Sequence, residues 1–282
     1  MVDCLKRVLM KRPGPAMANA DPDKWHYAVP LSLTRLRDNH DALVSAIRAA
    51  GTEVLFLDDD ESDLADAVFT HDPSLVTSEG AVILRMGKTL RGREPEVHRE
   101  FYRSHGIPIL GTIQEPGTIE GGDCLWLDAR TLAIGLGFRT NEAGLHQLKT
   151  ILAPLGVTVH PFDLPCLGGA DACLHLMSLI SLLDHDLALV YMPLLPVRLY
   201  QLLKDRHVRC LSAAGTEFAA SGGVNVNAVA LGPRRCLMVH GFPETIALVQ
   251  NAGCQVTAFA GDELCLKAEG GPSCLTRPIL RE

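Results

Sequence analysis

The chain has 282 residues, 47% of them apolar and 21% charged, which is enough apolar material for a large core. Its net charge of −7 argues against nucleic acid or an anionic membrane as a partner. No run reaches the roughly 18 apolar residues of a membrane-spanning helix, and residues 1–7 do not lead into the apolar region of a signal peptide. A cytoplasmic location is therefore expected.

Nine cysteines are scattered along the chain, and none forms a Cys-x-x-Cys pair. In a reducing compartment most of them are expected to be small, buried and inert side chains. Cys166, Cys173 and His175 lie close together, but they lack zinc-site spacing and a fourth ligand, so no metal site is predicted. The glycine-rich pieces are too short for a P-loop or a dinucleotide fingerprint.

Short apolar runs bounded by turn residues predict strands, and the longer charged stretches between them predict helices. The same order of strand, polar residue, strand, tight turn, strand and helix recurs along the chain. The predicted elements are Val54–Leu57, Leu75–Thr77, Ala81–Arg85 and helix Glu94–His105; Ile107–Ile113, Cys124–Leu127, Thr131–Gly135 and helix Asn141–Leu155; Val157–Phe162, Leu179–Leu183, Leu187–Tyr191 and helix Pro196–Asp205; Arg209–Leu211, Ala228–Leu231, Cys236–His240 and helix Pro243–Ala252; then Gln255–Phe259 and Leu275–Leu280.

The polar node of each unit falls at Asp72, Asp123, His175, Asn225 and Cys274, in steps of 51, 52, 50 and 49 residues. A period near 50 with one small sheet per repeat predicts a radial array of similar blades. Equivalent positions in such an array converge near the central axis, so distant residues would share one site. A doubly wound parallel sheet is the alternative, but the tight turns between strands are hairpin connections rather than crossovers.

The fifth unit lacks its last strand. Residues Lys6–Arg12 could supply it, with Leu31–Ala50 as its helix, so that the N-terminal strand closes the ring and removes an exposed sheet edge. No linker or low-complexity stretch interrupts the sequence. We therefore expect residues 1–282 to form one domain.

Cys274 is the residue that points most directly to chemistry. It follows Glu-Gly-Gly-Pro-Ser, a turn sequence in which backbone N–H groups can face a ligand. A thiol must lose its proton to attack carbon, and His175 at an equivalent node could accept it, although a histidine in Leu-His-Leu-Met is also typical of a core position. Glu120 could orient that imidazole, or it could belong to a polar turn.

Two carboxylates, Asp66 and Asp72, flank an apolar Ala-Val-Phe run. A carboxylate in such surroundings needs a cation, which is either an internal arginine or a cationic substrate. Arg91 and Arg139 are candidate anion binders.

Together these motifs resemble the dimethylarginine dimethylaminohydrolases of the arginine deiminase and amidinotransferase superfamily. The resemblance rests on Asp72, Glu-Gly-Gly-Asp at 120–123, Arg-Thr-Asn at 139–141, Leu-His-Leu at 174–176 and Gly-Gly-Pro-Ser-Cys at 270–274, and it runs from about residue 50 to the end. It implies a five-bladed α/β-propeller, the pentein fold. It also implies roles for single residues: Cys274 as nucleophile, His175 as general acid and base, Glu120 as the partner of His175, Asp72 and Asp66 as guanidinium binders, and Arg91 and Arg139 as binders of the substrate carboxylate.

The chain departs from the family pattern at His71, which stands where the hydrolases carry a carboxylate in Phe-x-Glu-Asp. The change removes up to one negative charge, so His71 is expected to tune the choice of substrate. Arg85 is an alternative to Arg91 as the matching arginine. The region Pro13–Tyr27 is the candidate for a loop that covers the substrate, on its position alone.

The resemblance implies hydrolysis at the guanidino carbon of an N-methylated arginine, which gives citrulline and a methylamine through a cysteine thiouronium, without a cofactor or metal. A deiminase that releases ammonia, an amidinotransferase and a non-catalytic guanidino-binding protein are the alternatives. The expected partner is a small cationic guanidino compound, and the expected assembly is a monomer or a homodimer.

Overall fold

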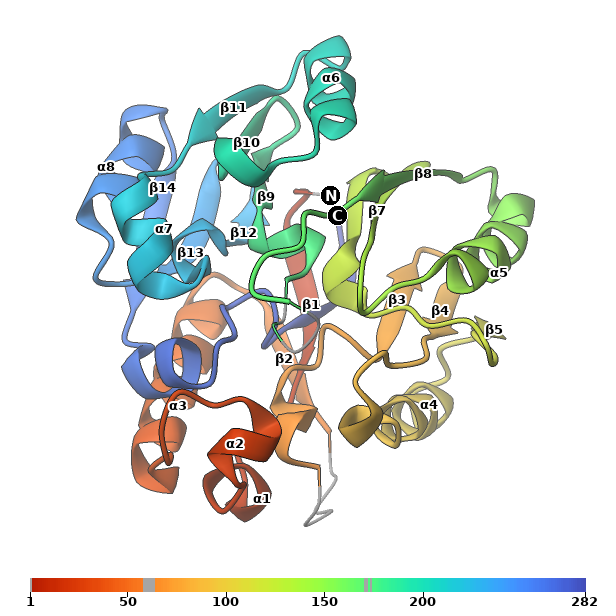
Figure 1. Cartoon of the computed structure of the whole chain (residues 1–282), viewed down its shortest axis with the longest axis horizontal. Coiled ribbons are helices and arrows are strands. Elements are labelled where there is room, and N and C mark those ends of the chain that lie inside the picture. Colours follow the sequence, from red (N-terminus) through yellow and green to blue (C-terminus); the bar gives the residue numbers. More distant parts are fainter. Residues whose placement is uncertain (1, 58–63, 170–171, 173) are drawn as a thin grey trace.

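The structure is a computed structural model that describes residues 2–57, 64–169, 172 and 174–282. In this part of the chain the strands form five separate three-stranded sheets, arranged around a common centre (Figure 1). The sheets are β3 (Ser74–Thr77), β4 (Gly80–Ile83) and β5 (Ile109–Thr112); β6 (Cys124–Asp128), β7 (Thr131–Leu136) and β8 (Thr158–Asp163); β9 (Ile180–Asp184), β10 (Leu187–Val190) and β11 (Arg209–Ser212); β12 (Val229–Gly232), β13 (Arg235–Val239) and β14 (Gln255–Phe259); and β15 (Arg277–Arg281), β1 (Leu5–Met10) and β2 (Glu53–Phe56).

Every sheet is built in the same way. Its first two strands are antiparallel, and its second and third strands are parallel with a helix between them. Parallel neighbours need such a crossover, whereas antiparallel neighbours can be joined by a tight turn. The crossover helices are α4 (Glu94–Ser104), α5 (Glu142–Leu152), α6 (Val197–Asp205), α8 (Pro243–Asn251) and α3 (Leu33–Ala49).

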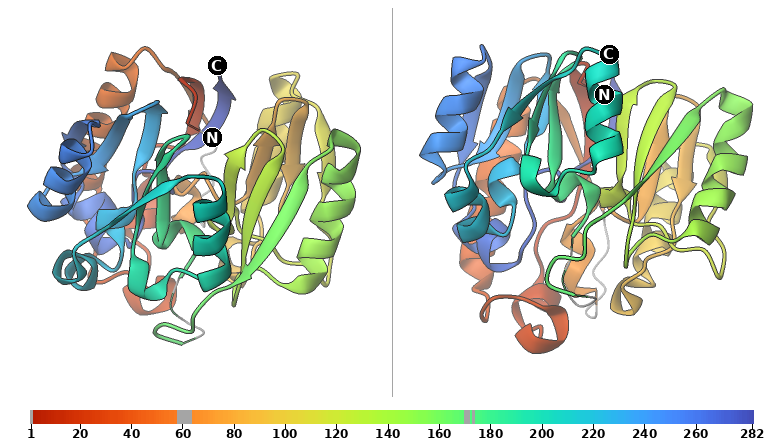
Figure 2. Two further views of the ribbon diagram at one scale, coloured as in Figure 1. Left: turned by 90° about the horizontal axis from the view of Figure 1, so that it is seen from above. Right: turned by 45° about the horizontal axis from the view of Figure 1, so that its top comes forward.

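The predicted repeat of five mixed α/β units is therefore confirmed, and the doubly wound parallel sheet is excluded. The N-terminal strand β1 lies in the middle of the fifth sheet. It pairs antiparallel with β15 and parallel with β2, so the two ends of the described chain meet in one sheet. The two termini lie on one face of the molecule in both views of Figure 2.

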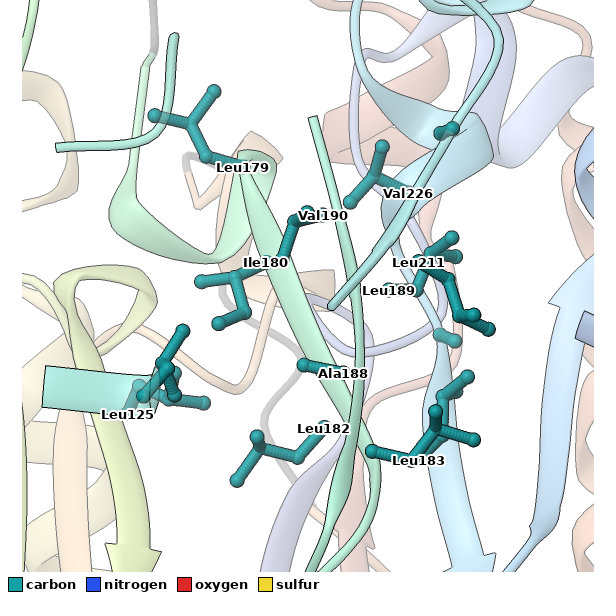
Figure 3. Packing of buried hydrophobic residues seen from close by; sticks show 14 of the residues in the cluster. Leu125, Leu179, Ile180, Leu182, Leu183, Ala188, Leu189, Val190, Leu211 and Val226 are labelled. Atoms are coloured by element: carbon teal, nitrogen blue, oxygen red, sulfur yellow. The ribbon is translucent and has the colours of Figure 1, made fainter. Parts of the chain in front are cut away.

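The core follows from the apolar runs that predicted the strands. A large cluster surrounds β9 and β10, where Leu183, Leu189 and Val190 are fully buried (Figure 3). Leu125 on β6 and Val226 before β12 belong to the same cluster, so it joins three neighbouring sheets. Apolar contacts between sheets therefore replace the hydrogen bonds that a continuous sheet would provide.

Several short elements were not predicted. They are α1 (Pro15–Ala18), α2 (Pro22–Trp25), α7 (Gly215–Ser221) and a π-helical turn, η8 (Asp262–Lys267). The helices α1 and α2 both start with a proline at a position where a helix needs no N–H donor. They lie on the side of the molecule opposite to the two termini (Figure 2). Among the described helices, none is both long and apolar enough to cross a bilayer.

Candidate functional site

The node residues join neighbouring sheets through hydrogen bonds. Each node stands just before the first strand of a sheet, so it lies where that strand leaves the centre of the molecule. Five bonds, one for each pair of neighbouring units, run around the centre. They are Gly121 N–H to Asp72 O (2.9 Å), Leu176 N–H to Asp123 Oδ1 (3.0 Å), Ala228 N–H to Ser181 Oγ (3.0 Å), Ser273 N–H to Asn227 Oδ1 (2.8 Å) and His71 N–H to Cys274 O (3.1 Å). We call these the ring bonds.

The predicted pair of His175 and Glu120 is present. His175 Nε2 lies 2.8 Å from Glu120 Oε2, and both side chains are buried. Burial acts to raise the pKa of Glu120, but the hydrogen bond and charge of His175 outweigh it and hold that pKa below its usual range. A buried carboxylate beside the ring fixes its orientation and stabilises its protonated form.

Ser178 and Gly122 also fix the position of the His175 ring. The His175 side chain accepts a hydrogen bond from the backbone N–H of Ser178, and Ser178 Oγ accepts one from His175 N–H at 3.3 Å. Gly122 lies directly against the ring, because a Cβ built there would overlap His175. With Nε2 on Glu120, the basic position of the neutral imidazole is Nδ1.

Glu120 is held by groups on two further segments. Its Oε1 accepts the backbone N–H of Lys88 at 2.9 Å and lies 3.5 Å from Arg139 Nη1. The structure thus places Arg139, a predicted anion binder, beside the His175–Glu120 pair. Its side chain is 10% exposed.

Asp123 and Thr140 support this pair and were not predicted as site residues. Asp123 Oδ2 accepts the Thr140 hydroxyl at 2.6 Å, and Thr140 Oγ1 accepts Glu120 N–H at 3.2 Å. Burial raises the pKa of Asp123 to about 6. The spacing signal was present, since Asp123 is the node of its unit and Thr140 follows Arg139.

Cys274 lies in the turn before β15 and is partly exposed, whereas four of the eight described cysteines are buried. Asn227 Nδ2 points at its Sγ from 3.6 Å, and Asn227 Oδ1 accepts both the N–H and the hydroxyl of Ser273 at 2.8 Å. Gly271 packs directly on Asn227. Asn227 therefore braces the cysteine turn, whereas the predicted node Asn225 bonds Thr245 instead.

Asp72 and Arg91, which were expected to contact the substrate, bond each other in the structure. Arg91 Nη1 bonds Asp72 Oδ2 at 2.6 Å, Nη2 bonds Phe69 O at 3.1 Å, and the guanidinium forms a fork with Glu94. Arg91 is 4% exposed. Its hydrogen bonds are directed into the chain, so it does not present a free guanidinium to a substrate carboxylate.

Asp72 also uses both of its carboxylate oxygens in hydrogen bonds within the protein. Its second oxygen, Oδ1, accepts the N–H of Gly122 at 2.9 Å. Burial opposes ionisation, but the Arg91 guanidinium overrides it and holds the pKa of Asp72 well below its usual range. Asp72 thus connects Arg91 to the glycine that supports His175. Of the two cations considered for Asp72, an internal arginine or a cationic substrate, the structure shows the internal arginine.

Asp66 lies under the α1–α2 segment. Its Oδ1 accepts the hydroxyl of Tyr27 at 2.7 Å, and its Oδ2 lies 2.7 Å from Lys88 Nζ. Lys88 Nζ also donates to Trp25 O at 2.9 Å and lies 5.0 Å from the centre of the Trp25 ring. The segment chosen as a covering loop on position alone therefore does contact a predicted substrate-binding carboxylate.

His71 is hydrogen-bonded to the segment that follows Cys274. Its Nδ1 lies 2.8 Å from Thr276 O, and its backbone oxygen accepts a hydrogen bond from Arg277. Burial, aided by Arg277, lowers the pKa of His71 to about 3, so the ring is neutral at pH 7. Arg85, the alternative to Arg91, is 39% exposed and faces Gly117 O and Glu115.

In the described part of the chain, no group of three or more histidine, cysteine, aspartate or glutamate side chains is placed to hold a metal ion. Cys173, one of the residues considered for such a site, lies outside the described residues.

Comparison with known proteins identifies the family. A model of the arginine deiminase family matches residues 60–206, more than half of the chain. The dimethylarginine dimethylaminohydrolase of Streptomyces coelicolor is 29% identical over 276 residues, with 96% of each chain covered. The enzyme of the same name from Pseudomonas aeruginosa is 27% identical over 239 residues, covering 85% of this chain and 86% of its own.

The fold comparison agrees. A P. aeruginosa dimethylarginine dimethylaminohydrolase variant complexed with citrulline superposes with a TM-score of 0.79 at 22% identity, covering 99% of this chain and all of that one. An amidinotransferase of Microseira wollei superposes with a TM-score of 0.83 at 18% identity, covering 99% and 95%. The chain therefore belongs to the arginine deiminase and amidinotransferase superfamily, as a member similar to the dimethylarginine dimethylaminohydrolases.

The contact between Gly122 and His175 predicts the effect of a single methyl group. In Gly122→Ala the new Cβ overlaps the imidazole, so His175 must leave Glu120 or the turn must shift. We expect the free energy of unfolding to fall by about 1–3 kcal/mol, measured by urea titration. Gly137→Ala is the control, because its Cβ would meet Leu164 at an ordinary 3.6 Å. Equal stability of the two variants would contradict the packing described.

The buried neutral histidines predict how stability depends on pH. His71 has a pKa of about 3 in the folded chain, where burial disfavours its charged form, and about 6.5 when unfolded. Between these values the unfolded chain binds one more proton, so stability is full above about pH 6.5 and is lost as pH falls toward 3. In His71→Asn we expect the slope of unfolding free energy between pH 4 and 6 to drop by up to about 1.4 kcal/mol per pH unit. An unchanged slope would contradict a neutral His71.

Proposed function

We propose that the chain is a hydrolase that attacks the guanidino carbon of an arginine-type substrate with Cys274. The observation that carries this proposal is the buried His175–Glu120 pair at 2.8 Å, on the same ring of bonds as a partly exposed cysteine braced by Asn227. A thiol and a charge-supported imidazole on one rigid frame are the parts that nucleophilic acyl-type chemistry needs. The family to which the chain belongs supports the choice of a guanidino substrate.

The substrate cation would bind at Asp66. In the structure the Lys88 ammonium already lies on that carboxylate, under Trp25 and Tyr27. A guanidinium can replace an ammonium there, because it offers paired N–H donors to the same oxygens and stacks on the same aromatic ring. Arg139, beside Glu120, is the residue that we assign to the substrate carboxylate, since Arg91 is bonded to Asp72 and Glu94.

The reaction then has two halves. In the first, the Cys274 thiolate attacks the central guanidino carbon, and the carbon–nitrogen bond breaks as the leaving amine takes a proton from His175. This gives a covalent S-alkylthiouronium. In the second, water attacks that carbon and gives one proton to His175. The carbon–sulfur bond then breaks and a second proton passes to solvent, where the released amine takes it up, which leaves a neutral ureido product and the thiolate.

The hydrogen bond between His175 and Glu120 supports a proton position and a counter-charge for this proposal. Nε2 of His175 keeps its hydrogen bond to Glu120. Nδ1 is therefore the nitrogen that gives and takes protons, and it gives up its contact with Ser178 N–H when it does so. Glu120 remains ionised and balances the imidazolium while it exists. The proposed chemistry draws on no cofactor or metal.

The leaving group decides which member of the superfamily this is. We propose a methylamine, with citrulline as the other product, because the dimethylarginine dimethylaminohydrolases match the chain over nearly their full length. The arginine deiminase of Listeria welshimeri is 24% identical, and the match covers 62% of that protein. Ammonia release from arginine is therefore the second candidate.

We also propose the domain organisation, the assembly and the compartment that the sequence predicts. All 282 residues would form one domain whose ring is closed by β1 against β15, acting as a monomer or homodimer. The eight described cysteines are free thiols, which supports a reducing compartment such as the cytoplasm.

Replacement of the nucleophile tests the mechanism. We expect Cys274→Ser to fold normally and to lose more than about 10³-fold in kcat for ureido product. A haloacetamidine should alkylate one thiol of the wild type at neutral pH, with substrate protecting it, and no equivalent thiol of Cys274→Ser. Cys166→Ser is the control, because Cys166 is an exposed free cysteine outside the site, and it should keep both turnover and alkylation. Full turnover by Cys274→Ser would refute the mechanism.

Product analysis tests the substrate. Purified protein incubated with asymmetric dimethylarginine should form citrulline and dimethylamine in equal amounts, with a kcat/KM above that for arginine. Citrulline and ammonia from arginine at a higher kcat/KM would favour the deiminase. A ureido product formed without added amine excludes an obligatory amidinotransferase, and a lack of any product would leave only the non-catalytic binding protein.

A further inference from the structure

A second cavity lies outside the site of Cys274 and His175. Its volume is about 830 Å³, within the range of small-molecule sites. Asp3 and Glu282 are among its lining residues, so it opens on the face that carries the two termini (Figure 2). The α1–α2 segment that covers Asp66 lies on the opposite side. His71, Ser273 and Thr276, which belong to the central segments, line the cavity as well.

Apolar side chains form most of the cavity wall. Leu125 and Trp126 come from β6, Met177 from the turn before β9, Leu182 from β9 and Ile279 from β15. Four different segments of the chain thus present hydrocarbon to one cavity. Such a wall favours a ligand with an apolar body, because water gains little from contact with it.

One strong cation is buried in the same wall. Arg277 is 3% exposed, and one of its terminal nitrogens donates to His71 O. Its Nε–H has no hydrogen-bond partner among the described residues, and no described carboxylate lies within ion-pair distance of its guanidinium. A buried charge with an unmade hydrogen bond is costly unless an anion or a water molecule completes it. The guanidinium geometry matches a carboxylate best.

We propose that this cavity binds a small apolar monocarboxylate, with its carboxylate on Arg277 and its hydrocarbon body against Leu125, Met177 and Leu182. Arg281 also lines the cavity, but its Nη1 donates to Asp3 O and Ala230 O. Asp3, Glu79 and Glu282 line the cavity as well, so the preference for a carboxylate rests on Arg277. The inference does not depend on the proposed hydrolysis.

The first test compares three ligands of equal chain length. Octanoate, octan-1-ol and octylamine are titrated into the wild-type protein by calorimetry. We expect octanoate to bind one site at least about tenfold more tightly than octanol and octylamine, as a charge-assisted hydrogen bond requires. Absence of saturable octanoate binding, which means a cavity that holds only water, overturns the proposal. Equal affinity for the three ligands also overturns it.

The second test locates the bound carboxylate. Arg277→Met should reduce the preference for octanoate over octanol to about one. Arg130→Met is the matched control, because Arg130 lines the same cavity but is exposed, and it should keep the preference. An Arg277→Met variant that binds octanoate like the wild type contradicts the assignment.

Arg277 also bonds His71, so its replacement could prevent folding, and a measurement on unaltered protein is needed. In protein labelled with ¹³C at the methionine methyl groups, octanoate should shift the Met177 signal saturably, assigned through Met177→Leu. Met86 and Met238 do not line the cavity, so their signals should move less. Shifts at these methionines without a shift at Met177 would place the ligand elsewhere and refute the proposal.

Discussion

The ring bonds are the interaction on which the arrangement of the molecule depends. The five sheets share no strand pairing with one another, so no continuous sheet fixes their mutual positions. The five hydrogen bonds of 2.8–3.1 Å connect each unit to the next one and the fifth to the first. Four of the five bonds use a node residue or its immediate neighbour, so the candidate site residues also help to hold the units together; the remaining bond joins Ala228 to Ser181. Rigid placement of Cys274 and His175 follows from the fold itself.

Most of the buried charges beside the candidate site are paired with opposite charges, and Arg277 is the exception among the described residues. Asp72, Arg91 and Glu94 form one group, and Glu120 with His175 and Arg139 forms another. Burial raises the pKa of Glu94 to about 7, whereas Arg91 keeps the pKa of Asp72 low. The desolvation of Asp72 is offset by Arg91, which is itself buried, and that of Asp66 by Lys88, which is partly exposed. In the function proposed above, only the second of these cations gives way to a substrate.

The repeat was readable from sequence because each sheet is a local unit with its own turn and helix, so spacing alone located the nodes. The His175–Glu120 pair followed from that spacing together with the family motifs. The pairing of Arg91 with Asp72 could not be predicted from the sequence, because a guanidinium can reach many carboxylates. Only the folded turn at 89–91 directs Arg91 to Asp72. The spacing predicted Asn225 as the node, whereas Asn227 is the residue that contacts Cys274. A period near 50 residues does not distinguish two positions that are only two residues apart. The helices α1 and α2 are too short for a hydrophobic period to show.

His71 links the two faces of the molecule. Its N–H donates to Cys274 O, its oxygen accepts from Arg277, and its ring reaches Thr276 O. A carboxylate at position 71 would be buried against a carbonyl oxygen and would lose the Thr276 contact, so a neutral donor suits this backbone better. The contact with Thr276 O is therefore the structural reason for this side chain, since the bonds to Cys274 and Arg277 use only the backbone of His71. In the function proposed above, position 71 supports the cysteine turn, and the guanidine is bound at Asp66 beneath the α1–α2 segment.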